Sequence, residues 1–303
     1  MSEPKRQHII PKCYLKQFVD PHTPTGQEPY VWIFDRGSNK GKKRAPRNIL
    51  TETDLYTFSG KDGTKNYSLE NSLAQIESDY ASLFEQKIGQ HLPLDAREHL
   101  VLCAFVAGML QRTLKQKANI EGFFDRLISR TEQMEQAHGA PPKTSLELKH
   151  AKENAHRFMI VQTVPAISNI LVNMNLAFLV ASRHSSFITS DAPCFLFNAE
   201  LQWQRLSGPE LAQRDVEVRM PLSPEISVSF TWVNNLRGYL CIGEDLVHEH
   251  NRMVYGYSDA HFIANSQKVK RRWFRCFPLD PLFIGRMIKH GVFTLRNLRY
   301  KRS

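Results

Sequence analysis

The sequence lacks the short motifs that mark several large enzyme superfamilies. Its 303 residues contain no G-x-x-x-x-G-K, no G-x-G-x-x-G, no H-E-x-x-H and no G-x-S-x-G. Each of these patterns holds phosphate-binding amides, zinc ligands or a serine nucleophile in a fixed geometry. Their absence argues against a P-loop NTPase, a Rossmann enzyme, a zincin and an α/β-hydrolase.

Cysteine is scarce and scattered. The five cysteines form no C-x-x-C pair, which argues against a disulfide framework and against a zinc knuckle. The start of the chain has no apolar stretch of the kind found in secretory leaders. The longest apolar run, residues 100–110, is much shorter than the ~20 residues needed to cross a bilayer. We therefore expect a reduced, cytoplasmic protein with no membrane partner.

That apolar run defines the core we expect. It lies in a helix predicted over about residues 95–117, and Asp95 with Glu98 at its start has the spacing of a capping box. A helix that is apolar on every side has to be covered on every side, so we expect other helices around it. The run ends at Arg112, and a buried arginine needs an anionic partner or ligand.

Apolar periodicity predicts the other elements. The predicted strands are residues 30–34, 55–58, 187–189, 194–197, 226–233 and 239–242, and the predicted helices are residues 68–91, 119–137, 145–181 (kinked or split at Pro165) and 244–257. The fold class is α+β: a mainly helical core around the central helix, short N-terminal strands and a small antiparallel sheet from the C-terminal half. Residues 1–303 are expected to form a single domain. The alternative is a mostly helical part (1–181) followed by a strand-rich part (182–303).

Positive charge is concentrated at both ends of the chain. Residues 1–50 carry 10 Lys and Arg against 4 Asp and Glu, and residues 268–303 carry 11 against 1. Basic clusters favour polyanions such as nucleic acid, although solvated tails have the same composition.

The C-terminal basic stretch also contains aromatic residues. Trp273 lies among Lys270, Arg271, Arg272 and Arg275. Such a stretch can stack bases and hold phosphates, or it can be an edge strand with a basic solvent-facing side.

Four residues of the first half can carry proton or phosphate chemistry. His8 can transfer a proton or ligate a metal, or it can be a half-buried structural histidine. Glu70 and Glu77 are seven residues apart, which puts both carboxylates on one flank of the same helix. The bland interpretation is that Glu70 stabilises the helix N-terminus and Glu77 is solvated. Arg112 can bind phosphate, or it can pair with one of these glutamates.

The segment from Ser190 to Pro193, between two apolar strands, is the strongest local signal in the second half. A carboxylate such as Asp191 at the end of a buried strand is held rigidly enough to act as a base or a metal ligand. Asp two residues before Pro is also ordinary turn chemistry. Both interpretations stay open.

Three blocks of the chain resemble a known family. The blocks are H-x-x-P-x-x-Y-L-x-x-F at residues 8–18, Glu70 with Ile76-Glu77, and F-I-T-S-D-A-P at residues 187–193. Together they are similar to the bacterial family named domain of unknown function 4238, over about residues 5–265. Ala192 departs from the pattern, because many relatives have Asn there.

The family brings no established activity. The resemblance implies only that a set of residues forms one site: His8, Tyr14, Glu77, Arg112, Ser190 and Asp191. Two residues in weaker blocks, Glu70 and Asn251, are added as binding residues.

These residues favour a nuclease-like enzyme. In this hypothesis Asp191 and Glu77 hold Mg²⁺ or Mn²⁺ or act as base, His8 transfers a proton, and Arg112 offsets developing charge. The basic ends would hold nucleic acid, and the expected setting is a bacterial toxin or phage-defence effector. The alternatives are a nucleic-acid-binding module without chemistry and a sensor of a small phosphorylated ligand.

Overall fold

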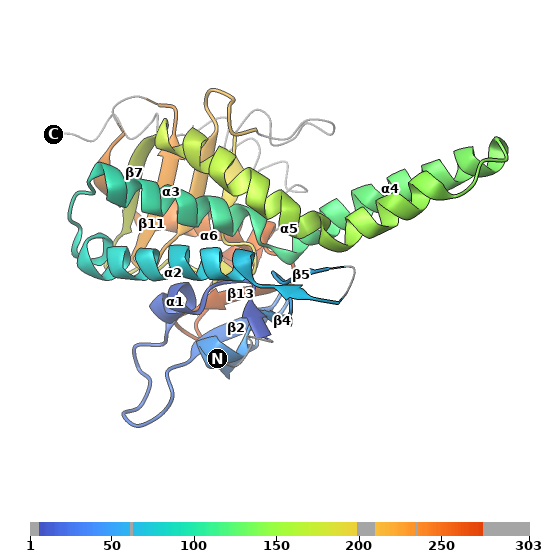
Figure 1. Ribbon diagram of the computed structural model, residues 1–303. Helices are drawn as coiled ribbons and strands as arrows, with labels where there is room; N and C mark the ends of the chain where they lie inside the picture. Colours follow the sequence, from blue (N-terminus) through green and yellow to red (C-terminus); the bar gives the residue numbers. More distant parts are fainter. Residues whose placement is uncertain (1–5, 61–62, 199–209, 234–235, 275–303) are drawn as a thin grey trace.

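The computed structural model describes residues 6–60, 63–198, 210–233 and 236–274. Figure 1 shows a layered body from which one long helical hairpin extends. Within those residues, no helix is both long and apolar enough to cross a membrane.

Three helices form a layer over the larger sheet: α2 (Ser68–Gln86), α3 (Ala96–Gln111) and α5 (Lys143–Val172) (Figure 1). The predicted capping box of α3 is confirmed, because Asp95 and Glu98 each accept a 2.8 Å hydrogen bond from the other's backbone N–H. α3 ends at Gln111 and not at residue 117. The reason is Thr113, whose hydroxyl accepts a hydrogen bond from the Gln116 N–H and so caps the next helix, α4 (Leu114–Ala137).

The larger sheet has five strands in the order β12 (Gly238–Ile242), β7 (Asn175–Ala181), β11 (Ile226–Thr231), β10 (Glu217–Pro221) and β9 (Phe195–Phe197). Its pairs are antiparallel except β12 with β7, which is parallel. β7 shows that the predicted helix over 145–181 is wrong at its end. The helix continues through Pro165 to Val172, and the following apolar run forms a strand. Periodicity alone does not separate these two possibilities in a short apolar run.

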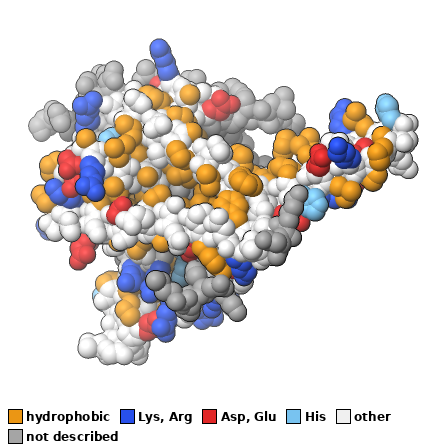
Figure 2. Space-filling view, in the orientation of Figure 1, with side chains coloured by type: hydrophobic (Ala, Val, Ile, Leu, Met, Phe, Trp, Pro, Cys, Tyr) orange, Lys and Arg blue, Asp and Glu red, His pale blue; other side chains and the backbone are white. Residues whose placement is uncertain are grey.

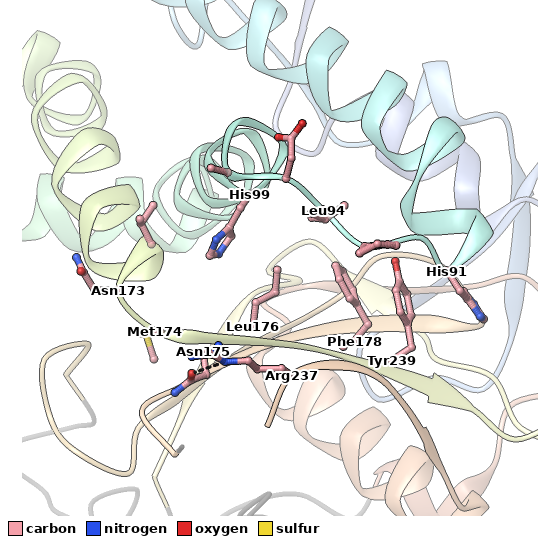
Figure 3. A pocket seen from close by; sticks show the side chains of 15 residues that line it. His91, Leu94, His99, Asn173, Met174, Asn175, Leu176, Phe178, Arg237 and Tyr239 are labelled. Carbon is pink, nitrogen blue, oxygen red and sulfur yellow. Dashed lines mark hydrogen bonds between the residues drawn. The ribbon is translucent and has the colours of Figure 1, made fainter. Parts of the chain in front are cut away.

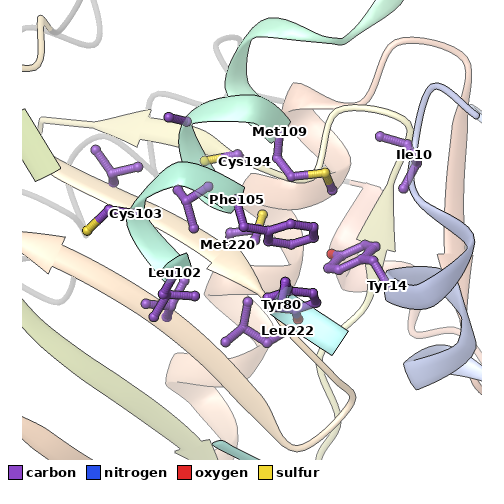
Figure 4. Packing of buried hydrophobic residues seen from close by; sticks show 14 of the residues in the cluster. Ile10, Tyr14, Tyr80, Leu102, Cys103, Phe105, Met109, Cys194, Met220 and Leu222 are labelled. Atoms are coloured by element: carbon purple, nitrogen blue, oxygen red, sulfur yellow. The ribbon is translucent and has the colours of Figure 1, made fainter. Parts of the chain in front are cut away.

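The main core lies between this sheet and the helical layer. Leu102 and Phe105 of α3 belong to one buried cluster with Val228 and Phe230 of β11. Tyr80 of α2 stacks on Phe105 with ring centroids 3.6 Å apart (Figure 4). The sheet therefore covers one side of α3. Leu100 on another side is 50% exposed, so the expectation of helices all round α3 is wrong.

A second sheet brings distant parts of the chain together. Its order is β3 (Gly41–Arg44), β2 (Val31–Asp35), β13 (His261–Ala264) and β8 (Thr189–Ser190), all antiparallel. Two ribbons lie beside it, β1 (Arg6–His8) with β4 (Thr51–Thr53) and β5 (Phe58–Ser59) with β6 (Lys65–Asn66). The predicted strand at 30–34 is confirmed. The one at 55–58 is wrong except at its end, because residues 55–57 lie between β4 and β5 and only Phe58 belongs to β5.

The remaining helices are α1 (Lys12–Leu15) and α6 (Glu244–Tyr257). α4 and α5 form the projecting hairpin (Figure 1), and the Lys149–Glu132 and Lys152–Asp125 ion pairs join the two helices at its surface. Helices, short N-terminal strands and small, mostly antiparallel sheets confirm the predicted α+β class. Figure 2 shows Lys and Arg side chains gathered over the part of the body that contains the N-terminal strands.

Candidate active site

Arg112 lies at the centre of a polar cluster just after α3 ends. Its side chain is 4% exposed and has three protein partners. Nη1 donates to Glu77 Oε1 at 2.7 Å, Nη2 to the His8 carbonyl at 2.7 Å, and Nε to the Tyr56 hydroxyl at 3.1 Å. The anionic partner expected for this buried arginine is therefore Glu77. His8, Glu77 and Arg112, which the sequence places far apart, meet at one point.

Tyr56 is a member of this cluster that the sequence did not single out. The Arg112 guanidinium lies over its ring, 5.0 Å from the centroid, and the Tyr56 hydroxyl donates to the Arg112 carbonyl at 3.4 Å. Burial raises the pKa of Tyr56, against the effect of Arg112. The only hint in the sequence was a tyrosine in a short apolar segment, which is equally typical of core.

The backbone of His8 is bound on both sides, and one nitrogen of its ring has no hydrogen-bond partner in the described part of the chain. β1 pairs it with Thr51, and Arg112 binds its carbonyl. Desolvation lowers the pKa of His8, while nearby Glu77 and a hydrogen bond to the Pro46 backbone oppose that shift. Nε2 is buried and has no hydrogen-bond partner in the described part of the chain. The ring is thus biased toward a neutral imidazole with one nitrogen unused.

The two glutamates of α2 have different environments. Glu77 is 24% exposed and paired with Arg112. Glu70 is half-buried, and desolvation raises its pKa, with Arg112 opposing and the Glu77 charge adding to the increase. Both carboxylates therefore interact with Arg112, which agrees with the prediction that their seven-residue spacing puts them on one flank of the helix. Glu70 holds a proton more readily than a solvated glutamate does.

Cys13 of α1 closes one side of the cluster. Its thiol donates to the Glu77 carbonyl at 3.6 Å. Burial and the Glu77 charge raise its pKa to about 11. A thiol with such a pKa is almost fully protonated near neutral pH, so it does not supply a nucleophile.

Asp191 lies in a turn, with its carboxylate fully engaged there. Oδ1 accepts a hydrogen bond from the Asp259 N–H at 2.8 Å, and Oδ2 accepts from the N–H groups of Ala260 and His261 at 2.7 and 2.8 Å. The buried Ser190 hydroxyl accepts from the Ala192 N–H at 3.2 Å. These contacts are the turn chemistry that was the alternative interpretation of this segment. Catalytic roles for Ser190 and Asp191 stay predictions without support from the geometry.

Tyr14 and Asn251 join chain segments inside the core. The Tyr14 hydroxyl lies 2.6 Å from Thr189 Oγ1 and donates to the Pro221 carbonyl at 2.7 Å, and burial raises its pKa. Asn251 accepts from the Ile188 N–H at 3.0 Å and donates to the Ser186 carbonyl at 2.8 Å. Both side chains are completely buried and bonded to protein, so their contacts are structural.

The C-terminal basic stretch packs on the start of α6. Lys270 and Arg272 pair with Glu244, and Trp273 is buried and donates to His248 Nδ1 at 3.0 Å. The predicted edge strand is instead a 3-10 turn, Arg271–Phe274. Arg271 is exposed, and Arg275 lies outside the described residues. Trp273 is therefore not free to stack on a base.

A different basic segment borders the cluster. Pro46, whose backbone contacts His8, lies two residues after the end of β3, the edge strand of sequence GKKR. Lys12 is close enough to lower the pKa of His8. Lys43 lies over the rings of Tyr30 and Trp32, at 4.5 and 5.3 Å. Positive charge from the N-terminal end, and not from the described C-terminal residues, therefore adjoins His8.

Side chains that could bind a metal ion are not clustered in the described part of the chain. Among the residues that the structure describes, no three His, Cys, Asp or Glu side chains are arranged to hold a metal ion. Glu77 and Asp191, the two predicted metal ligands, do not share a site. Glu77 binds Arg112, and Asp191 accepts hydrogen bonds from the backbone of its own turn. A divalent cation stays a prediction.

Comparison with known proteins adds a family and no activity. A family model described as a protein of unknown function (DUF4238) matches residues 6–268, which confirms the resemblance seen in the three sequence blocks. No curated protein and no solved structure matches the chain.

Proposed function

We propose that this chain, which belongs to the DUF4238 family of unknown function, hydrolyses phosphodiester bonds of nucleic acid at the cluster around His8. The proposal assigns three roles. His8 Nε2 accepts the proton of an attacking water, whose oxygen bonds to phosphorus as the ester P–O bond breaks. Glu70 gives a proton to the leaving oxygen. Arg112 is a positioning residue, since Glu77, Tyr56 and the His8 carbonyl bind its side chain.

The observation that carries the proposal is the unused nitrogen of His8 beside positive charge. A buried polar atom without a partner costs free energy, and His8 Nε2 is one of several such atoms in the described part of the chain; what sets it apart is its place beside Arg112 and Lys12. Here that atom belongs to a histidine whose pKa is lowered, and a base has to be neutral before it accepts a proton. Lys12 and, on β3, Lys43 and Arg44 supply the charge that a phosphate backbone binds, whereas Lys42 is paired with Asp35. A cytoplasmic setting, with its nucleic acids, is part of the proposal.

The test is cleavage of labelled oligonucleotides by the full chain. Single-stranded RNA, single-stranded DNA and duplex DNA are incubated with and without Mg²⁺, and products are resolved on a denaturing gel. We expect cleavage of at least one substrate, with His8→Ala reducing the rate by at least about 100-fold. The matched control is His150→Ala, because His150 is exposed on the projecting hairpin. Equal rates for the two variants would contradict the proposal.

A binding module without chemistry is the second candidate. The observation in its favour is the Arg112 network itself, whose three contacts are all with protein atoms. In that case oligonucleotides bind with a strong salt dependence but are not cut. Replacing Lys43 and Arg44 with Glu would then abolish binding, whereas His8→Ala would leave it unchanged.

A further inference from the structure

A cavity of about 670 Å³ lies at the opposite end of α3 from Arg112 (Figure 3). α3 has 16 residues and is therefore about 24 Å long, so this cavity is separate from the His8 cluster. Its walls come from the start of α3, the junction of α5 with β7, and the start of β12. Among its lining residues are His99, Asn175, Leu176, Phe178, Arg237 and Tyr239.

His99 supplies an unused hydrogen-bonding atom at one wall. Its imidazole lies nearly parallel to the buried Phe230 ring, at 11° and 6.2 Å between centroids. Nε2 is buried and has no partner among the described residues, and burial lowers the pKa of this histidine. Figure 3 shows the ring pointing into the cavity. A neutral imidazole here can donate to or accept from a ligand.

Arg237 supplies positive charge at the opposite wall. Its Nε donates to Asn175 Oδ1 at 3.1 Å, and the Asn175 amide donates to the Val233 carbonyl at 3.2 Å. This contact fixes the guanidinium by Nε, and no ion pair to Arg237 exists within the described residues. The two Nη atoms can then form a bidentate hydrogen bond with a carboxylate or phosphate. The carboxylate of Asp95, which also lines the cavity, caps α3, where the helix N-terminus offsets its charge.

The side chains between these two walls are apolar and aromatic, with Phe178 buried and with Leu176 and Tyr239 partly exposed. Phe178 and Tyr239 stack at 15° with centroids 4.6 Å apart, and His91 stacks on the other face of Tyr239 at 4.8 Å. The Tyr239 hydroxyl donates to the Leu92 carbonyl at 3.0 Å, which fixes the ring. Leu176 lies beside Phe178 in the view of Figure 3. A rigid apolar floor with a few polar groups at its edges is the usual form of a small-molecule site.

We propose that this cavity binds a planar aromatic anion. The ring of the ligand packs against the exposed parts of Leu176 and Tyr239, its anionic group binds Arg237, and a polar edge of the ring pairs with His99 Nε2. A nucleoside monophosphate and an aromatic carboxylate share this chemistry. The inference does not depend on the proposed function, because it uses neither His8 nor its neighbours.

Calorimetric titration of the full chain tests this site. The probes are adenosine 5′-monophosphate and 4-hydroxybenzoate, with adenosine and inorganic phosphate as fragments that lack the charge or the ring. We expect at least one of the two aromatic anions to bind at least about tenfold more tightly than either fragment. Tighter binding of the nucleotide identifies a nucleotide site, and tighter binding of the benzoate identifies a carboxylate site.

Three variants assign that binding to the cavity. Arg237→Ala should weaken binding of the anion by at least about tenfold, and His99→Phe, which keeps a stacked ring, should also weaken it. Arg97→Ala is the matched control, since Arg97 is exposed near the start of α3 and does not line the cavity. Thermal melting of each unliganded variant shows whether it is folded. Failure of both anions to bind the folded wild type, or equal affinity in Arg97→Ala and Arg237→Ala, would overturn the proposal.

Discussion

Replacing Arg112 with Met should destabilise the protein by about 3–5 kcal/mol, the usual cost of removing one partner from a buried ion pair. The structure gives two reasons for this magnitude. Arg112 donates to a carboxylate, a carbonyl and a hydroxyl, and each hydrogen bond to a charged group is worth about 1.5–3 kcal/mol. Removal of the desolvation cost of Arg112 offsets part of that sum. Glu77 is 24% exposed, so water partly compensates the carboxylate that is left behind.

Urea unfolding followed by far-ultraviolet circular dichroism measures this loss. Arg130→Met is the matched control, because Arg130 is exposed on α4 and surface substitutions usually change stability by less than about 0.5 kcal/mol. A double-mutant cycle with Glu77→Gln then isolates the coupling between the two side chains. If Arg112→Met unfolded at the same urea concentration as Arg130→Met, the cluster would not be the buried network described above.

Three further results are expected. Asp191→Ala should lower the free energy of unfolding by about 2–4 kcal/mol, because three backbone N–H groups lose their acceptor; an unchanged urea midpoint would refute the turn assignment. Stability should fall with pH below about 6.5, since burial lowers the pKa of His8, His99 and His250 in the folded state. The unfolded chain then binds more protons, so stability is present above that value and is lost toward the folded pKa values; urea midpoints that are equal at pH 7.5 and 5.5 would contradict this. Cys241→Ser should remove one fast-reacting thiol in a thiol-titration assay at pH 8, whereas Cys194→Ser should remove none, because Cys241 is exposed and burial raises the pKa of Cys194.

Local signals predicted much of the fold. The capping box at Asp95 fixed the start of α3, and apolar spacing located α2 and α6. The wrong predictions concern segments whose pattern of apolar residues is compatible with two different secondary structures. Residues 175–181 are apolar throughout, so only their pairing with β11 and β12 makes them a strand. Residues 112–117 kept a helical pattern, but Thr113 starts a new helix there.

The candidate site was predictable only in part. The buried end of α3 required an anion for Arg112, and the spacing of Glu70 and Glu77 put both near it. Tyr56 could not be found, because nothing local distinguishes a tyrosine that contacts an arginine from one in the core. Asp191 could be a turn residue or a catalytic base, because aspartate is common in both roles. Only the three hydrogen bonds that its carboxylate accepts in the structure identify it as a turn residue. The cavity near His99 depends on contacts among α3, β7 and β12 that no single segment encodes.

The most direct test of the central claim is hydrolysis of bis(4-nitrophenyl) phosphate by wild-type chain and by His8→Ala, followed as release of nitrophenolate. We predict hydrolysis by the wild type, loss of at least about 100-fold in rate in the variant, and a rate that declines at acid pH as His8 takes up a proton. A wild type without hydrolysis, or a variant with the wild-type rate, would contradict the assignment of His8 as the proton acceptor.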